Sequence, residues 1–162
     1  MKLTAQEEYG LRCLWQLVRA PSGSLTIPEI ARAESLTPAD VAKLMGILRR
    51  LGLVKSTRGQ KGGYELARPA DQIPLAEVLF GLGGHLYSLE FCRRHSGARA
   101  ECVHQSDCSI RALFAALEHG VVQALSGLTI HDLIRSERAM HGWIQLRGRE
   151  APVSATALAG EV

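Results

Sequence analysis

Three of the four cysteines lie close together in a polar segment of the chain. Cys92, Cys102 and Cys108 fall within residues 88–108, separated by nine and by five residues, whereas Cys13 stands apart. Thiolates bind iron–sulfur clusters and zinc, and they also form reversible disulfides. The segment shows no hydrophobic periodicity, and such a segment is usually functional or disordered. The pattern favours metal or cluster binding, with redox-active thiols and incidental cysteines as alternatives.

Two histidines widen the set of possible ligands. His95 and His104 lie in the same segment and could each replace a cysteine. Cys102, His104 and Cys108 could form a zinc site, because four nitrogen or sulfur ligands suffice for zinc. Cys13 lies among the apolar residues of a predicted helix and is expected to be a small buried hydrophobe.

The elements that must position this segment begin with helices and a β-hairpin. Residues 4–19 show helical apolar periodicity, and Thr26 and Thr37 are each predicted to begin a further helix as its N-cap. Residues 53–57 and 64–67 are predicted strands on either side of a glycine-rich loop. Two short helices joined by a tight turn are typical of a helix-turn-helix, and the hairpin is typical of a wing. The predicted fold class is mainly α with a small β-hairpin.

Positive charge is concentrated around the third helix and the hairpin. The whole chain carries a net charge of +3, but residues 43–68 hold seven basic residues and one acidic residue, a balance of +6. Such density indicates either a solvated face or a surface that neutralises phosphates. The outward face of the third helix is small and basic, which suits a helix lying in a major groove. The expected DNA-binding residues are Thr37, Ala39, Asp40, Lys43, Arg49 and Arg50 on the helix and Arg58, Gly59 and Lys61 in the wing.

Downstream of the hairpin, the sequence predicts a short helix over residues 74–80 and then a long apolar one. Apolar residues recur every three or four positions from Ile110 to Leu128. So wide an apolar face covers either one broad core surface or a core surface together with a partner. The end of the chain, from about Arg147, has small residues without a pattern and is expected to be mobile.

Several classes of protein are disfavoured by composition and motif. The 162 residues contain no apolar run of the roughly 20 residues needed to cross a bilayer, and two adjacent glutamates near the N-terminus do not suit a signal peptide. A cytoplasmic protein is therefore expected. HExxH, GxSxG and GxxxxGK[ST] motifs are absent from the sequence, so we do not expect an enzyme. The alternative from a different functional class is a small metal-dependent enzyme or an electron carrier.

Taken together, these motifs resemble the Rrf2 family of winged-helix transcription regulators over roughly residues 1–140. The resemblance rests on the start MKLT, on the wing RGQKGGY with the apolar helix that follows it, and on the later cysteine cluster. It implies a homodimer that pairs through the long helix and binds dyad-symmetric, double-stranded operator DNA. In many members an iron–sulfur cluster sets the DNA affinity.

The resemblance implies that the three clustered cysteines are cluster ligands, and it leaves the fourth ligand open. Some relatives carry a ligating histidine three residues beyond the last cysteine, where this chain has Arg111. Others use an acidic residue of the first helix, which here is Glu8 and would come from the partner subunit. A 4Fe-4S cluster is then favoured, with 2Fe-2S as the alternative, although Arg12 replaces a histidine used by some members. Glu8 could instead form an ion pair with Arg12 one turn later.

The expected function is that of an iron–sulfur-dependent transcription regulator that senses redox state, nitric oxide or iron supply. A metal-free regulator of the same fold, which senses oxidants through thiol–disulfide exchange, is the alternative. The expected organisation is a winged helix-turn-helix domain (1–71), a connecting helix (72–87), a cluster-binding loop (88–108), a dimerisation helix region (109–140) and a partly disordered tail (141–162).

Overall fold

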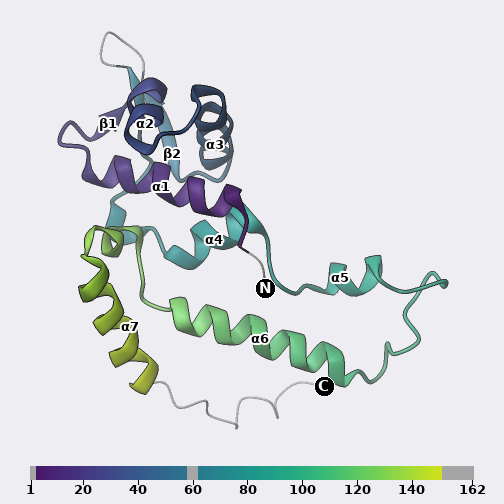
Figure 1. Ribbon diagram of the computed structural model, residues 1–162. Coiled ribbons are helices and arrows are strands. Elements are labelled where there is room, and N and C mark those ends of the chain that lie inside the picture. The colour runs from purple at the N-terminus through teal and green to yellow at the C-terminus, as the bar shows by residue number, and fades with distance from the viewer. Residues whose placement is uncertain (1–2, 58–61, 151–162) are drawn as a thin grey trace.

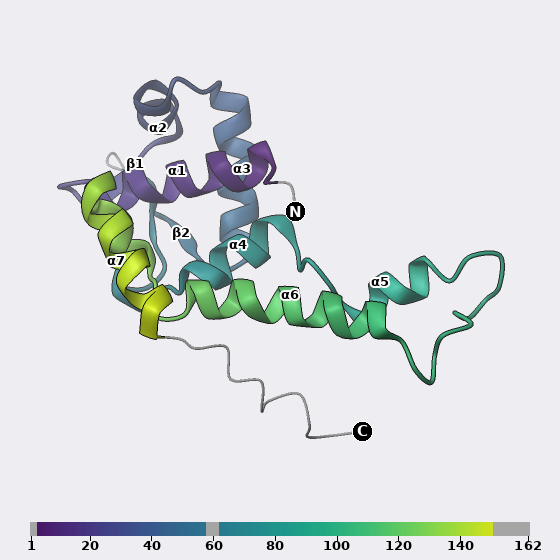
Figure 2. The ribbon, with the colours of Figure 1, turned by 60° about the horizontal axis from the view of Figure 1, so that its bottom comes forward.

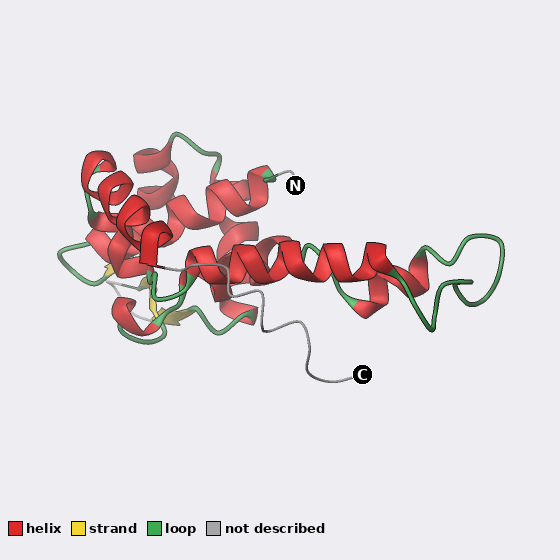
Figure 3. Ribbon diagram, turned by 90° about the horizontal axis from the view of Figure 1, so that it is seen from below, coloured by secondary structure: helices red, strands yellow, loops and turns green. Residues whose placement is uncertain are grey.

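A computed structural model describes residues 3–57 and 62–150 of the chain. Helices dominate it, and the short strands lie together at one end of the molecule (Figure 3). The long helix α6 and the segment around α5 extend away from that end as an arm (Figures 1 and 2). The elements are α1 (Ala5–Arg19), β1 (Ser24–Leu25), α2 (Ile27–Glu34), α3 (Pro38–Arg50), β2 (Val54–Thr57), β3 (Gly63–Leu66), η1 (Ala70–Gln72), α4 (Leu75–Gly83), α5 (Leu89–Arg94), α6 (Ser109–Leu125), η2 (Ile130–Ile134) and α7 (Glu137–Glu150).

Threonine side chains begin the first three helices. The predicted N-caps at Thr26 and Thr37 are confirmed, and Thr4 caps α1 in the same way. In each case the threonine hydroxyl accepts a hydrogen bond from the backbone N–H three residues later, which satisfies one of the free donors of a helix start. Local sequence alone therefore fixes where these helices start.

The hairpin is confirmed, and a third strand completes a small antiparallel sheet. The strand order is β1-β3-β2, with Val54 opposite Leu66 and Ser24 opposite Glu65. β1 has only two residues, too few for any periodicity to reveal. Gly63 permits this third strand, because a Cβ there would lie 2.7 Å from the backbone oxygen of Leu25.

The apolar core lies between α1, α3, α4 and the segment that follows α6. Leu128, predicted on the long helix, lies beyond the end of α6 and is only 4% exposed. Leu75 N donates to Leu128 O at 2.8 Å and Ile130 N donates to Ile73 O at 3.0 Å, so the chain returns from the arm directly onto the start of α4. The described helices include none long and apolar enough to span a bilayer.

Two predicted segments contain helices that the apolar pattern does not show. Residues 89–94, expected within a loop, form α5, and residues 141–150, expected as the start of the tail, belong to α7. Met140 and Trp143 of α7 contact the core, so tertiary packing supports this helix. Residues 151–162 lie outside the described part of the chain.

A buried carboxylate joins α1 to the end of α2. The Glu34 side chain is 6% exposed. Arg12 donates from Nε to Glu34 Oε2 at 2.6 Å and from Nη2 to the Glu34 backbone oxygen at 2.6 Å, and Gln16 Nε2 donates to Oε1. A buried carboxylate requires such partners. The bonds therefore fix the end of α2 just before the turn into α3, where Ser35 adopts a φ of 54°.

Arg12→Leu should destabilise the protein, because it leaves the Glu34 carboxylate buried without its charged partner. We expect the free energy of unfolding to fall by about 2–4 kcal/mol. Glu34→Leu should cost less, because the Arg12 side chain is 34% exposed and its guanidinium can turn to water. Urea denaturation followed by circular dichroism measures both changes. Arg32→Leu, at an exposed position of α2, is the control, and a loss as large as that of Arg12→Leu would contradict the proposed role of the buried pair.

Candidate functional site

Aromatic side chains hold α5 against α6. The ring centroids of Tyr87 and Phe114 lie 6.1 Å apart, and Phe91 meets Phe114 edge-on at 6.2 Å. Phe91 also stacks on His95, with ring centroids 4.2 Å apart. Cys92 lies on α5, so this aromatic cluster (Tyr87, Phe91, His95 and Phe114) fixes the first clustered cysteine to the long helix.

Glu118 of α6 forms hydrogen bonds to the segment that leads into α5. Its Oε2 accepts hydrogen bonds from the backbone N–H groups of Leu86 at 2.8 Å and Tyr87 at 3.3 Å, and its Oε1 lies 2.6 Å from His85 Nδ1. Burial acts to raise the pKa of Glu118, but the hydrogen bonds from His85 and the two amides outweigh it and lower that pKa. The carboxylate thus stays charged and links α6 to the residues that precede α5.

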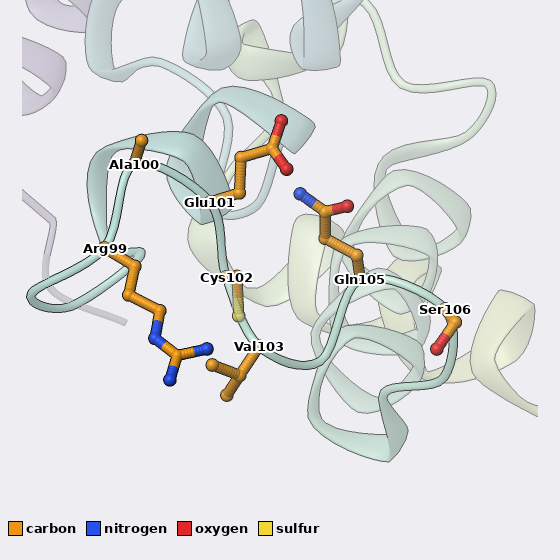
Figure 4. A pocket seen from close by; sticks show the side chains of 7 residues that line it. All are labelled: Arg99, Ala100, Glu101, Cys102, Val103, Gln105 and Ser106. Carbon is orange, nitrogen blue, oxygen red and sulfur yellow. The ribbon is translucent and has the colours of Figure 1, made fainter.

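The three clustered cysteines occupy different local environments. All three are free, partly exposed thiols. Cys92 Sγ lies 3.4 Å from Tyr87 Oη, and Cys108 caps α6, its Sγ accepting a hydrogen bond from Arg111 N at 3.4 Å. Cys102 lies in the irregular loop between them and lines an open pocket of about 580 Å³ with Arg99, Val103 and other loop residues (Figure 4).

Within one chain these cysteines do not form a preassembled metal site. No group of three His, Cys, Asp or Glu side chains in residues 3–57 and 62–150 is placed to hold a metal ion. The zinc set of Cys102, His104 and Cys108 is therefore not assembled here. Arg111 instead donates from Nη2 to the backbone oxygen of Gln105 at 3.0 Å, so its side chain holds the end of the cysteine loop.

Glu8 lies on α1 and faces outward. It borders a shallow pocket of about 230 Å³ with Leu11, Arg12, Trp15 and Leu133. Arg12 forms its salt bridge with Glu34 and not with Glu8. The negative charge of Glu8 still acts on Arg12 and helps to raise its pKa, after the larger effect of the hydrogen bond to Glu34.

The outward face of α3 has the small, basic character that the sequence predicts. Val41, Leu44 and Leu48 are buried beneath it. Thr37 and Asp40 bond each other at the helix start, with 2.6 Å between Oγ1 and Oδ2. Arg58, Gly59 and Lys61, predicted in the wing, lie outside the described residues. The predicted residues of this helix are all exposed: Thr37, Ala39, Asp40, Lys43, Arg49 and Arg50.

Tyr87, Phe114 and Glu118 belong to the site and were not predicted from the sequence. Tyr87 and Glu118 are 31 residues apart and meet only because the chain folds back onto α6. The one local signal is a pair of aromatic residues within the five positions before Cys92, Tyr87 and Phe91. Aromatic residues beside a cysteine are equally consistent with ordinary packing, so that signal alone assigns no role.

The chain is similar over most of its length to one protein family and to several known proteins and solved structures. Residues 3–136 match the sequence profile of the Rrf2 family, described as "Iron-dependent Transcriptional regulator". Protein aau3 of Rhizobium meliloti (strain 1021) is 30% identical over 153 residues, which cover 94% of this chain and 96% of that protein. CymR (YrzC), the global cysteine regulator of B. subtilis, is 26% identical with a TM-score of 0.63, covering 82% of this chain and 95% of CymR. IscR of T. potens is 23% identical with a TM-score of 0.63, covering 87% of this chain and 96% of IscR.

The four thiols should differ sharply in reactivity. Burial raises the pKa of Cys13 to about 11, so at pH 8 its thiol stays protonated as well as inaccessible. In the metal-free, reduced protein, iodoacetamide should modify Cys92, Cys102 and Cys108 at least roughly tenfold faster than Cys13. Peptide mass spectrometry measures the rates, and unfolding in urea is the control that should remove the difference. Equal rates in the folded protein would contradict the buried position of Cys13.

Proposed function

Because the chain belongs to the Rrf2 family of transcriptional regulators, we propose that it is a homodimeric regulator whose binding to operator DNA depends on an iron–sulfur cluster. One observation carries the proposal. Two partly exposed thiols, those of Cys92 and Cys108, are fixed at the two ends of one irregular loop, and the loop carries a third thiol at Cys102. The same chain presents a small, basic recognition helix.

Binding of DNA by α3 follows from its shape and charge. The side chains of Ala39 and Ala42 are small, so the exposed face of the helix can approach base edges closely. The longer side chains of Lys43, Arg49 and Arg50 can reach phosphates on either side. These three cations form no ion pair within the described residues, so their charge is available to phosphates. The wing residues Arg58, Gly59 and Lys61 would add contacts in the neighbouring minor groove.

Pairing of two chains through α6 would cover an apolar surface that a single chain leaves in water. Ile110, Leu113 and Leu117 are 58%, 57% and 56% exposed, and no residue of α6 is buried. Contiguous apolar surface of this kind marks interaction sites. The spacing of these residues along one helix suits the same helix of a second copy as the partner.

The donor set fits an iron–sulfur cluster in its chemistry. Cys92, Cys102 and Cys108 would hold the cluster, and Glu8 of the other chain would supply the fourth ligand of a 4Fe-4S cluster, with 2Fe-2S as the alternative. Bound there, the cluster would supply sensitivity to redox state, nitric oxide or iron supply. A bound cluster would hold the Cys102 loop together with Cys92 and Cys108, and through Glu8 it would link that loop to α1 of the partner.

The path from the cysteine loop to the DNA-binding helix would run through α1. Glu8 lies one turn before Arg12, and Arg12 is bonded to Glu34 at the end of α2. A shift of α1 on ligation would therefore move the helix-turn-helix with it. The two states would differ in the spacing of the two recognition helices, and so in their affinity for the operator.

A second candidate is a metal-free regulator that senses oxidants by disulfide formation among the same three cysteines. It is favoured by the absence of a preassembled group of three metal-ligating side chains in the described residues. The likeness to Staphylococcus aureus CymR, whose structure has been solved in an oxidized form, is also consistent with it. The two candidates share the fold and the DNA-binding face, and they differ in whether protein purified without oxygen contains iron and sulfide.

Anaerobic purification followed by native mass spectrometry tests cluster and dimer together. We expect a dimer mass with bound iron and sulfide, and visible absorption that Cys92→Ala, Cys102→Ala and Cys108→Ala each remove. The affinity of the wild-type protein for a DNA duplex selected from random sequences should differ between its cluster-bound and cluster-free forms. Each of the three variants should lack this difference. Cys13→Ala is the matched control and should keep both properties. A colourless wild-type protein would contradict the cluster proposal and favour the disulfide-based regulator. A monomer mass would contradict pairing through α6.

The salt dependence of DNA binding tests the recognition helix. Each phosphate contact that is lost lowers the slope of log Kd against log salt concentration by about 0.9. Lys43→Gln should therefore weaken binding and reduce the slope by about that amount, as measured by fluorescence anisotropy over a series of salt concentrations. Arg138→Gln, at an exposed position of α7, is the control. If both variants keep the wild-type slope, Lys43 does not contact phosphate.

A further inference from the structure

Tyr87 places a hydrogen-bond donor against the first of the clustered cysteines. Its Oη lies 3.4 Å from Cys92 Sγ, and both side chains are partly buried. A thiolate has no proton to give, whereas a phenol has one. If Cys92 is a thiolate, the hydrogen bond can therefore run only from Tyr87 to the sulfur.

The position of Tyr87 is fixed at three points. Its backbone N–H donates to Glu118 Oε2 at 3.3 Å, its ring contacts Phe91 and Phe114, and its hydroxyl meets Cys92. Glu118 and Phe114 both belong to α6, so the phenol is held by the helix that also begins at Cys108. These contacts together place the hydroxyl beside the sulfur.

A phenol ordinarily keeps its proton at neutral pH, so the Tyr87 hydroxyl can act as a donor. Within the described part of the chain, this hydroxyl is the one side-chain group that hydrogen-bonds any of the three clustered thiols.

We propose that Tyr87 is a positioning residue that donates a hydrogen bond to the Cys92 sulfur in the cluster-bound protein, and that it raises the reduction potential of the cluster. This inference rests on the proposed function. A hydrogen bond to a ligating sulfur withdraws electron density and stabilises the more negative, reduced cluster. Cys108 receives a backbone N–H instead, so the two fixed ligands are tuned by different means.

Tyr87→Phe tests the proposal, because it removes only the hydroxyl. We expect the cluster to assemble and its midpoint potential, measured by anaerobic spectroelectrochemical titration, to become more negative. A tenfold change in the ratio of oxidised to reduced cluster corresponds to about 59 mV for one electron, and we expect a change of up to about this size. Tyr64→Phe on β3 is the matched control and should leave the potential unchanged.

A second variant keeps the proposal testable if Tyr87→Phe does not assemble a cluster. Tyr87→3-fluorotyrosine retains the ring and the hydroxyl but makes the phenol a stronger donor, so the potential should become less negative. A purely structural role would not produce this opposite shift. A wild-type potential in this variant, or in a cluster-containing Tyr87→Phe protein, would overturn the inference alone. A colourless wild-type protein would instead overturn the proposed function.

Discussion

The Glu34 carboxylate constrains the arrangement of the DNA-binding domain. A charged group that is 6% exposed must have its donors in place, and α1 supplies two of them, Arg12 and Gln16. Arg12 also bonds the backbone oxygen of Glu34, so it contacts both the side chain and the end of α2. These bonds therefore tie the end of α2, and the turn before α3, to α1.

The arm is stabilised in a different way, because it has little core of its own. No residue of α6 is buried, and the cysteine segment is held by Glu118 and by the aromatic cluster. Hydrogen bonds and a few ring contacts fix the ends of the segment. Its middle, around Cys102, has no regular secondary structure. Such a division suits a loop that must change conformation while its attachment points remain in position.

Local signals explain which features were predictable. Thr26 and Thr37 cap helices through residues three positions away, so their roles can be recognised in the sequence. Turn-forming glycines likewise mark the hairpin. β1, α7 and the inward turn at Leu128 depend on contacts with distant residues, and no local pattern encodes them. The candidate site divides similarly: the cysteines are evident from their spacing, whereas the donor role of Tyr87 depends on α6.

The segment made of α4 and the arm begins and ends at one point of the fold. Pro74 and Thr129 form a β-bridge, flanked by the bonds from Leu75 to Leu128 and from Ile130 to Ile73. The segment between these residues contains α4, which packs in the core, and then the arm, so both ends of the arm are attached to the core near this bridge. Doubling the length of a flexible loop adds only about 0.6 kcal/mol of closure entropy. A different number of residues between Cys92 and Cys102 would therefore cost the fold little, so this segment can vary in length while the elements from α1 to α4 keep their arrangement.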